Sequence, residues 1–200
     1  MLPQRHDASR IGLLGGSFNP AHEGHREISL EALKVLGLDA VWWLATPGNP
    51  LKESDGYAYA PYEERLATAR RVANHPRIIV SNFEERKHLQ YTVDTLEALT
   101  DLWPQINFVW LMGADSLIHF NRWKNWRKIA SMAPIAVFNR PGYEKAALAS
   151  EAAKELALFR VPSGRAADIV GAEPPAWTFI ETTKNPASAT AIRSGKTGPD

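Results

Sequence analysis

Residues 11–25, with the sequence IGLLGGSFNPAHEGH, decide the fold that this chain is predicted to adopt. A short apolar run leads into two consecutive glycines, and His22 and His25 follow, three residues apart. An apolar run of this length that ends at glycine predicts a buried strand. Apolar residues then recur at helical spacing from about residue 22 to residue 36, just before Gly37, so a helix is predicted to follow the turn directly.

The same succession of short apolar strands and helices continues along the chain. The strands are continuous apolar runs without polar alternation, which is typical of a parallel sheet covered by helices on both faces. We therefore predict an α/β fold with a Rossmann-like, doubly wound parallel sheet of about five to six strands. Strands are expected at 11–15, 40–45, 77–82, 106–113, 134–140 and 177–182, and helices at 22–36, 61–73, 91–103, after 113, at 144–159 and at 188–195.

The size of the chain favours one domain. Its 200 residues are 44% hydrophobic, which suffices for a single core of ordinary size. The predicted domain spans residues 1–200, with a flexible N-terminus over 1–9 and a short C-terminal tail over 196–200. The Pro- and Gly-rich stretch at 162–176 interrupts the pattern and is predicted to be a loop inside this domain.

Composition excludes several classes of function. The formal net charge is +1, so neither a broad nucleic-acid surface nor a membrane-binding surface is expected. The chain has no cysteine, which rules out disulfides, thiolate catalysis and cysteine-bound metal centres. No apolar run is long enough to cross a membrane, and the charged N-terminal segment is unlike a secretory signal. A cytoplasmic protein is expected, and homo-oligomer formation is left open.

Three of the predicted strands end in segments rich in Gly, Pro, Asn or Asp. These segments are GGSFNP after the first strand, TPGNP after the second and GADS after the fourth. Ligands of parallel sheets bind outside the carboxyl ends of the strands, where the strand order reverses. The three segments are therefore predicted to line one binding site.

The histidines beside the double glycine allow three interpretations. Glycines let a backbone approach a phosphate closely, and a helix that begins near His22 turns its positive end towards the same place. His22 and His25 lie one helical turn apart, so both rings can face one ligand. The segment can also be a plain glycine turn with surface histidines, or part of a zinc site, for which the sequence offers no obvious third ligand.

Taken whole, residues 15–25 resemble the G-G-[ST]-F-[DN]-P-x-H-x-G-H signature of the nucleotidylyltransferase superfamily. Residues 188–195, SATAIRSG, resemble its [ST]-[SA]-T-x-[IL]-R motif. The resemblance implies the fold of that superfamily, with His22, His25 and Arg193 as catalytic residues at the phosphates of a nucleoside triphosphate. The ATP site that it implies consists of Gly15, Gly16, Ser17, Phe18, His22, His25, Ser188, Thr190 and Arg193.

The middle of the chain resembles one family of that superfamily, the nicotinate-nucleotide adenylyltransferases. GADSLIHFNRWKNW at 113–126 is similar to their G-x-D-x-L-x-x-F-x-x-W-x-x-[WY] block, and YTVDTL at 91–96 is similar to their Y-T-x-x-T-L segment. The resemblance implies that Trp123 stacks on the nicotinate ring, whereas Trp126 is expected in the core. The acceptor site that it implies consists of Thr92, Asp115, Trp123, Lys52 and Asn19.

That family transfers AMP from ATP to nicotinate mononucleotide, giving nicotinate adenine dinucleotide and pyrophosphate, a step of NAD biosynthesis. For this chain the resemblance implies the same reaction between two small molecules, with Mg²⁺ bound through the phosphates of ATP. A sister adenylyltransferase that uses nicotinamide mononucleotide is an alternative, because the two acceptors differ by one charge. A non-catalytic nucleotide-binding domain is the alternative from another class.

Overall fold

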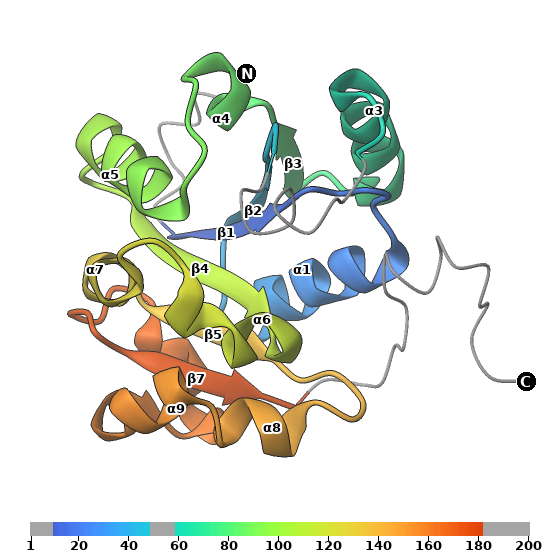
Figure 1. Ribbon diagram of the computed structural model, residues 1–200. Coiled ribbons are helices and arrows are strands. Elements are labelled where there is room, and N and C mark those ends of the chain that lie inside the picture. Colours follow the sequence, from blue (N-terminus) through green and yellow to red (C-terminus); the bar gives the residue numbers. More distant parts are fainter. Residues whose placement is uncertain (1–9, 49–58, 182–200) are drawn as a thin grey trace, which may run out of the picture.

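The computed structural model describes residues 10–48 and 59–181 of the protein. In these ranges seven strands form one sheet in the order β3-β2-β1-β4-β5-β7-β6, and every pair of neighbours is parallel (Figure 1). This confirms the predicted α/β fold with a parallel sheet. The strands are β1 (Arg10–Gly16), β2 (Ala40–Ala45), β3 (Ile78–Ser81), β4 (Asn107–Gly113), β5 (Ile135–Phe138), β6 (Arg160–Val161) and β7 (Trp177–Ile180).

The predicted number of five to six strands is wrong, because β6 adds a seventh to the six that the sequence predicted. β6 consists of Arg160 and Val161, which pair with Trp177 and Thr178 of β7. A strand of two residues carries no periodic pattern. It is therefore revealed only by its pairing with a distant segment.

Helices connect the strands and cover the sheet. The helix predicted at 144–159 is wrong as a single element, because the Ser150 side chain accepts a hydrogen bond from the Ala153 N–H and begins a separate helix. The stretch at 162–176, predicted to be a loop, contains a 3-10 helix. The helices are α1 (Glu23–Val35), α3 (Tyr62–Ala73), α4 (Phe83–Arg86), α5 (Thr92–Leu102), α6 (Ala114–Ile118), α7 (Trp126–Met132), α8 (Glu144–Leu148) and α9 (Glu151–Glu155), with the 3-10 helices η1 (Phe120–Arg122), η2 (Ala157–Phe159) and η3 (Ser163–Ile169).

Two hydrophobic layers enclose the sheet, one on each face. Successive side chains of a strand point to opposite faces, so the neighbours Trp42 and Trp43 of β2 belong to different layers. Trp42 packs in the layer that α5 and α7 cover, together with Trp126, which is buried as predicted. Trp43 packs in the layer of α1 and α3, where its indole N–H donates to Ser29 Oγ over 2.7 Å.

The order of the strands reverses between β1 and β4. From β1 the sheet continues to β2 and β3 on one side, and from β4 to β5, β7 and β6 on the other. The connections that leave β1 and β4 therefore run in opposite directions and leave room for a ligand between them. The sequence predicts the site at the segments that follow β1, β2 and β4, and all three of these strands end at this carboxyl edge of the sheet.

Candidate active site

The turn after β1 is anchored in the core by Phe18. This side chain is 1% exposed and stacks face to face on Trp43, with the ring centroids 4.9 Å and the planes 7° apart. The φ angle of Phe18 is 45°, a left-handed conformation that a bulky residue seldom adopts and that its burial here stabilises. The His25 ring lies 4.9 Å from the Phe18 ring. Phe18 therefore determines where the two histidines emerge at the start of α1.

His22 and His25 lie against each other at the carboxyl edge. Their ring centroids are 3.9 Å apart and their planes are inclined by 35°. The backbone N–H of His22 donates to Nδ1 of His25 over 3.2 Å. This contact places the proton of a neutral His25 ring on Nε2. The structure thus brings together the two side chains that the motif predicts to face one ligand.

Asp115 and Arg140 form a cluster with the histidines. Arg140 Nη1 donates to Asp115 Oδ2 over 3.0 Å. Glycine at position 113 lets the carboxylate fold back towards β4, because a Cβ there would lie 2.5 Å from Asp115 Oδ1. We call His22, His25, Asp115 and Arg140 the histidine cluster. Its members follow β1, β4 and β5, three neighbouring strands of the sheet.

His22 is uncharged at neutral pH. Burial lowers its pKa from 6.5 to about 4, and the nearby positive charge of Arg140 adds to this effect while Asp115 opposes it. The residue is 6% exposed, and its Nδ1 reaches no hydrogen-bond partner within the part of the chain that the structure describes. His22 itself therefore carries no charge, and the Arg140 guanidinium places a positive charge near it.

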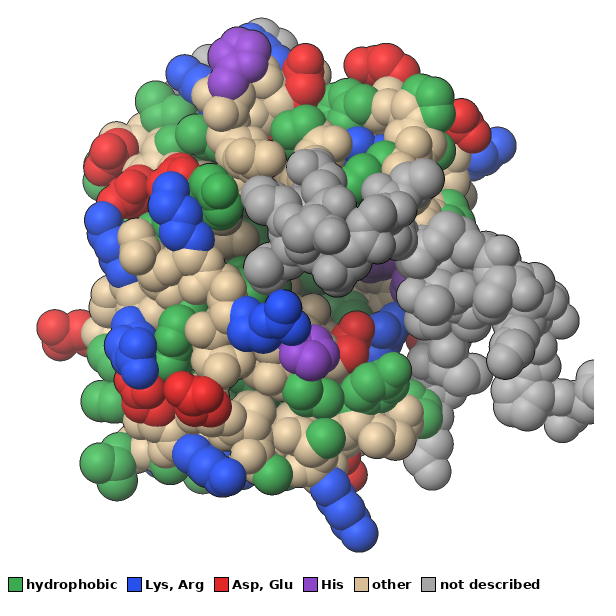
Figure 2. All heavy atoms as spheres, in the orientation of Figure 1, with side chains coloured by type: hydrophobic (Ala, Val, Ile, Leu, Met, Phe, Trp, Pro, Cys, Tyr) green, Lys and Arg blue, Asp and Glu red, His purple; other side chains and the backbone are tan. Residues whose placement is uncertain are grey.

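Arg140 is a residue that the sequence did not single out. The prediction for 134–140 places it inside a strand, whereas β5 ends at Phe138 and Arg140 lies beyond that carboxyl end. A charged residue at the carboxyl end of a predicted parallel strand is the signal that points to it. Figure 2 shows basic, acidic and histidine side chains close to one another beside a hollow on this face.

Trp123 lies on the α5 and α7 side of the sheet. Its ring packs edge-on against Trp110 of β4 and Phe120 of η1, with centroids 6.2 Å and 5.4 Å away. Trp110 in turn lies against Gly15 of β1, where a Cβ would come within 2.6 Å of its Cη2 atom. Glycine at position 15 thus lets Trp110 close on β1, and Trp110 links the half-buried Trp123 to the strand that leads into the histidines.

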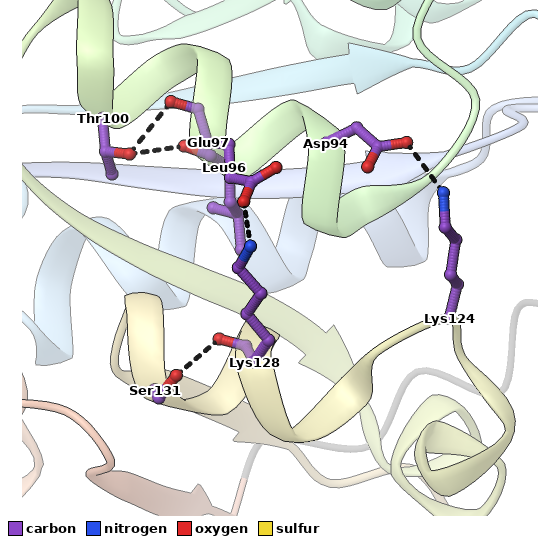
Figure 3. A network of polar contacts seen from close by, with 7 residues as sticks. All are labelled: Asp94, Leu96, Glu97, Thr100, Lys124, Lys128 and Ser131. Atoms are coloured by element: carbon purple, nitrogen blue, oxygen red, sulfur yellow. Dashed lines mark hydrogen bonds and ion pairs between the residues drawn. The ribbon is translucent and has the colours of Figure 1, made fainter.

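Lys124, the residue after Trp123, joins this segment to α5. Its Nζ lies 3.4 Å from Asp94 Oδ2 and 4.1 Å from the centroid of the Tyr91 ring. Figure 3 shows this ion pair between α5 and the segment that precedes α7. These contacts bring the YTVDTL segment, with Thr92 as the first residue of α5, close to the segment that carries Trp123. Thr92 and Trp123, two residues of the predicted acceptor site, therefore belong to neighbouring segments.

The remaining predicted site residues fall into two groups. Asn19 is buried, and its Oδ1 accepts a hydrogen bond from the Ala60 N–H over 3.1 Å, which ties the turn after β1 to the segment before α3. A contact of Asn19 with substrate stays a prediction. Four predicted residues lie outside the described residues: Lys52, Ser188, Thr190 and Arg193.

A buried carboxylic acid, Glu84, lies near the end of β2. It is 5% exposed and accepts a hydrogen bond from Thr95 Oγ1 over 2.9 Å. Burial raises its pKa to about 7, although hydrogen bonds from Thr95 and Thr46 oppose the rise. Because Glu84 stands next to Glu85, it resembles part of a solvated acidic pair, and the sequence carries no signal of its burial.

Residues 10–48 and 59–181 contain neither a cluster of metal-ligating side chains nor a membrane-spanning helix. No three His, Cys, Asp or Glu side chains are grouped there as a metal site would require. His22 and His25, considered as part of a zinc site, thus have no third ligand in these two ranges. Nor does either range contain a helix with the length and apolar character needed to cross a membrane.

Comparison with known proteins identifies relatives along most of the chain. The model of the cytidylyltransferase-like family matches residues 13–195. A protein of Ruegeria sp. (strain TM1040), named "Probable nicotinate-nucleotide adenylyltransferase", is 48% identical over 183 residues, which are 92% of this chain and 95% of that protein. A protein of Parvibaculum lavamentivorans with the same name is 49% identical over 184 residues, covering 92% of this chain and 90% of its own.

A solved structure shares the fold. Plasmodium falciparum nicotinic acid mononucleotide adenylyltransferase, complexed with NaAD, superimposes with a TM-score of 0.70 over 93% of this chain and 83% of that one. The two sequences are 15% identical in this comparison. At that identity the likeness concerns the arrangement of the sheet and helices alone.

Proposed function

The chain belongs to the nicotinate-nucleotide adenylyltransferases of the cytidylyltransferase-like family, and we propose that AMP passes from ATP to nicotinate mononucleotide at its histidine cluster. The products are nicotinate adenine dinucleotide and pyrophosphate, and the reaction is a step of NAD biosynthesis. The observation that carries the assignment of the site is the meeting of His22, Asp115 and Arg140 at the carboxyl ends of three neighbouring parallel strands.

The reaction requires the protein to align two phosphate groups and does not require a covalent intermediate. An oxygen of the acceptor's 5′-phosphate attacks the α-phosphorus of ATP, in line with the bond to the leaving pyrophosphate. One P–O bond forms as the other breaks, without a covalent link to the protein. The nucleophile is already an anion, so no strong general base is needed. The protein then contributes by aligning the two phosphates and by neutralising their charge.

His22 would act as a neutral hydrogen-bond donor to the α-phosphate, and His25 would donate to it from Nε2. The pKa of His22, near 4, leaves its ring uncharged at physiological pH, and the contact at Nδ1 of His25 leaves the proton of that ring on Nε2. Donors aimed at oxygens where charge develops stabilise the transition state more than the ground state. Arg140, held by Asp115, would supply positive charge at the same place. The groups predicted for the β- and γ-phosphates are Ser188, Thr190 and Arg193.

Magnesium would enter the site with ATP. This hard cation takes oxygen ligands and is usually bound by substrate phosphates and water together with one or two carboxylates. Asp115 carries the carboxylate of the histidine cluster, and its ion pair with Arg140 uses Oδ2, which leaves Oδ1 as the oxygen suited to a bound cation. When bound, the ion neutralises phosphate charge. Arg140, held by Asp115, would bind the α-phosphate from the side of β4 and β5.

The acceptor would bind where Trp123 and the start of α5 meet. An electron-poor pyridine ring stacks well on an indole, and Trp123 is held edge-on by Trp110 and Phe120. The first N–H groups of α5, together with Thr92, suit the carboxylate of nicotinate. A carboxylate gains more from these donors than the neutral amide of nicotinamide does. Lys52 is the predicted partner of the acceptor's phosphate.

The direct test follows pyrophosphate release from ATP and Mg²⁺ with nicotinate mononucleotide or nicotinamide mononucleotide as the sole acceptor. We expect rapid release with the nicotinate compound and slower release with the nicotinamide compound. A reaction without acceptor controls for hydrolysis of ATP. Equal rates with both acceptors would argue against the selectivity, and no release above that control with either would argue against the reaction itself.

A further inference from the structure

A buried arginine connects the two loops that flank the carboxyl end of β2. Arg65 lies at the end of the first turn of α3 and is 2% exposed, on the same face of the helix as the buried Leu66 and Ala69. Its guanidinium donates to four backbone carbonyls, which belong to three separate segments. The acceptors and distances are Ser17 O at 2.5 Å, Thr46 O at 2.9 Å, Pro47 O at 2.8 Å and Ala60 O at 3.1 Å.

The arrangement suits arginine specifically. Guanidinium presents five N–H donors in a rigid plane and does not lose its charge in proteins, so it can serve several acceptors in different directions at once. The burial of a charge is costly unless its donors are satisfied. Tyr59 and Tyr62 add their ring faces, with centroids 5.2 Å and 5.1 Å from Arg65 Cζ. A lysine ammonium has three donors on a single atom and cannot span these carbonyls.

The carbonyls that Arg65 holds belong to functional segments. Ser17 lies in the turn that leads to the histidine cluster, and Thr46 and Pro47 begin the TPGNP loop, which precedes Lys52. Ala60 is joined to the same turn a second time, because its N–H donates to Asn19 Oδ1. Arg65 therefore sets the distance between the turn of the triphosphate site and the loop predicted for the acceptor phosphate.

From this geometry we propose that Arg65 is a positioning residue for adenylyl transfer. It acts through backbone carbonyls and keeps the α-phosphate of ATP and the attacking phosphate in line. The proposal rests on the function proposed above. A displacement of about 1 Å between reacting groups can cost a hundredfold in rate, so the alignment of two loops from different strands is a sensitive quantity. Loss of the four hydrogen bonds of the Arg65 guanidinium should therefore lower kcat much more than it raises either KM.

The test compares Arg65→Lys with the wild-type protein and with a matched control, Arg71→Lys, on the exposed side of the same helix. Single-turnover AMP transfer is measured with saturating ATP, Mg²⁺ and nicotinate mononucleotide, well below the Tm of each protein. For Arg65→Lys we expect the rate to fall roughly tenfold to a hundredfold, with both KM values changed less than about threefold, as is typical of misalignment rather than lost binding. Arg71→Lys should match the wild type.

Folding of each variant is checked by circular dichroism and Tm. Arg65→Gln serves as a second variant, because its planar amide can still donate to some of the carbonyls that the guanidinium binds. A folded variant at position 65 that keeps the wild-type single-turnover rate overturns the proposal. A loss seen only as higher KM values, or a failure of both variants to fold, also overturns it, in favour of a purely structural role. Lack of pyrophosphate release by the wild-type protein would instead refute the proposed function, so the two failures are distinguishable.

Discussion

Arg65 and Arg140 both lie at the carboxyl edge of the sheet, in opposite surroundings. Arg65 is buried and directs its donors to backbone carbonyls of three segments. Arg140 keeps 17% of its side chain exposed, pairs with the carboxylate of Asp115 and helps to lower the pKa of His22. One guanidinium holds the backbone in place, and the other acts on titratable groups at the site. The positive charge that holds the loops in place therefore belongs to Arg65, and the positive charge beside the proposed reaction site belongs to Arg140.

Two buried titratable groups also differ in this way, one at the proposed reaction site and one within the scaffold. His22, in the histidine cluster, has its pKa lowered to about 4, and Glu84, behind the end of β2, has its pKa raised to about 7. Burial is the main cause in both cases and favours the neutral form of each group. The neutral His22 faces the proposed phosphate site, whereas Glu84 is bound to Thr95 within the scaffold. Substitutions on the two sides should therefore change different observables.

The largest effect is expected for a substitution in the histidine cluster. His25→Ala should lower kcat by roughly a hundredfold or more, because it removes a donor to the transition state. His75→Ala is the control, since His75 precedes the amino end of β3, at the opposite edge of the sheet. The measurements are steady-state pyrophosphate release and Tm. Near-normal turnover in a folded His25→Ala protein would remove the histidine from the mechanism.

On the scaffold side, Glu84→Gln should change stability and its pH dependence. Between pH 4.5 and 7 the unfolded state has lost the Glu84 proton while the folded state retains it, so the free energy of unfolding falls with rising pH, by up to about 3 kcal/mol. His22 has the opposite sign, because between pH 4 and 6.5 the unfolded state binds the extra proton and stability rises with pH. The two slopes oppose each other between pH 4.5 and 6.5.

Urea titrations from pH 4 to pH 8 would separate the two slopes. For the wild-type protein, the opposing contributions of Glu84 and His22 should leave the free energy of unfolding nearly constant from pH 4.5 to 6.5. From pH 6.5 to 7 only Glu84 still titrates, so the free energy of unfolding should fall. Glu84→Gln, whose amide oxygen still accepts from Thr95, should gain stability up to pH 6.5 and then stay level. Identical pH profiles for the two proteins would show that Glu84 titrates normally.

A smaller effect is expected for Trp123→Ala in the acceptor region. Loss of one aromatic stacking partner costs about 1–3 kcal/mol in comparable sites, so the KM for nicotinate mononucleotide should rise roughly 5-fold to 150-fold. The KM for ATP should stay close to its wild-type value, because Trp123 packs on Trp110 and Phe120 rather than on the histidines. Equal increases in both KM values would refute the stacking assignment.

The smallest effect is expected at the surface ion pair between Lys128 and Glu97, which joins α7 to α5 (Figure 3). Both side chains are exposed, and such pairs contribute about 0–1 kcal/mol. Lys128→Met keeps the apolar stem and should lower stability by less than about 1 kcal/mol, with kcat unchanged. A double-mutant cycle with Glu97→Gln measures the pair directly. A coupling well above that value would mean that this contact resembles the buried bonds of Arg65 more than a surface pair.

Much of the fold could be predicted because it depends on local patterns. Continuous apolar runs predict the six longer strands, and their composition predicts that they are parallel. β6 and the break at Ser150 escape prediction for different reasons. β6 exists only through its pairing with Trp177 and Thr178, and the Ser150 cap interrupts a stretch whose alanines favour one continuous helix.

The candidate site divides in the same way. GGSFNPAHEGH carries its glycine turn, its helix start and the spacing of His22 and His25 within eleven adjacent positions, so the sequence by itself determined the site motif and the family. Arg65 binds Ser17 from 48 positions away, and Arg140 reaches Asp115 from 25 positions away. Only the tertiary structure decided these contacts and the neutral state of His22, because burial and long-range electrostatics exist only once distant segments are packed together.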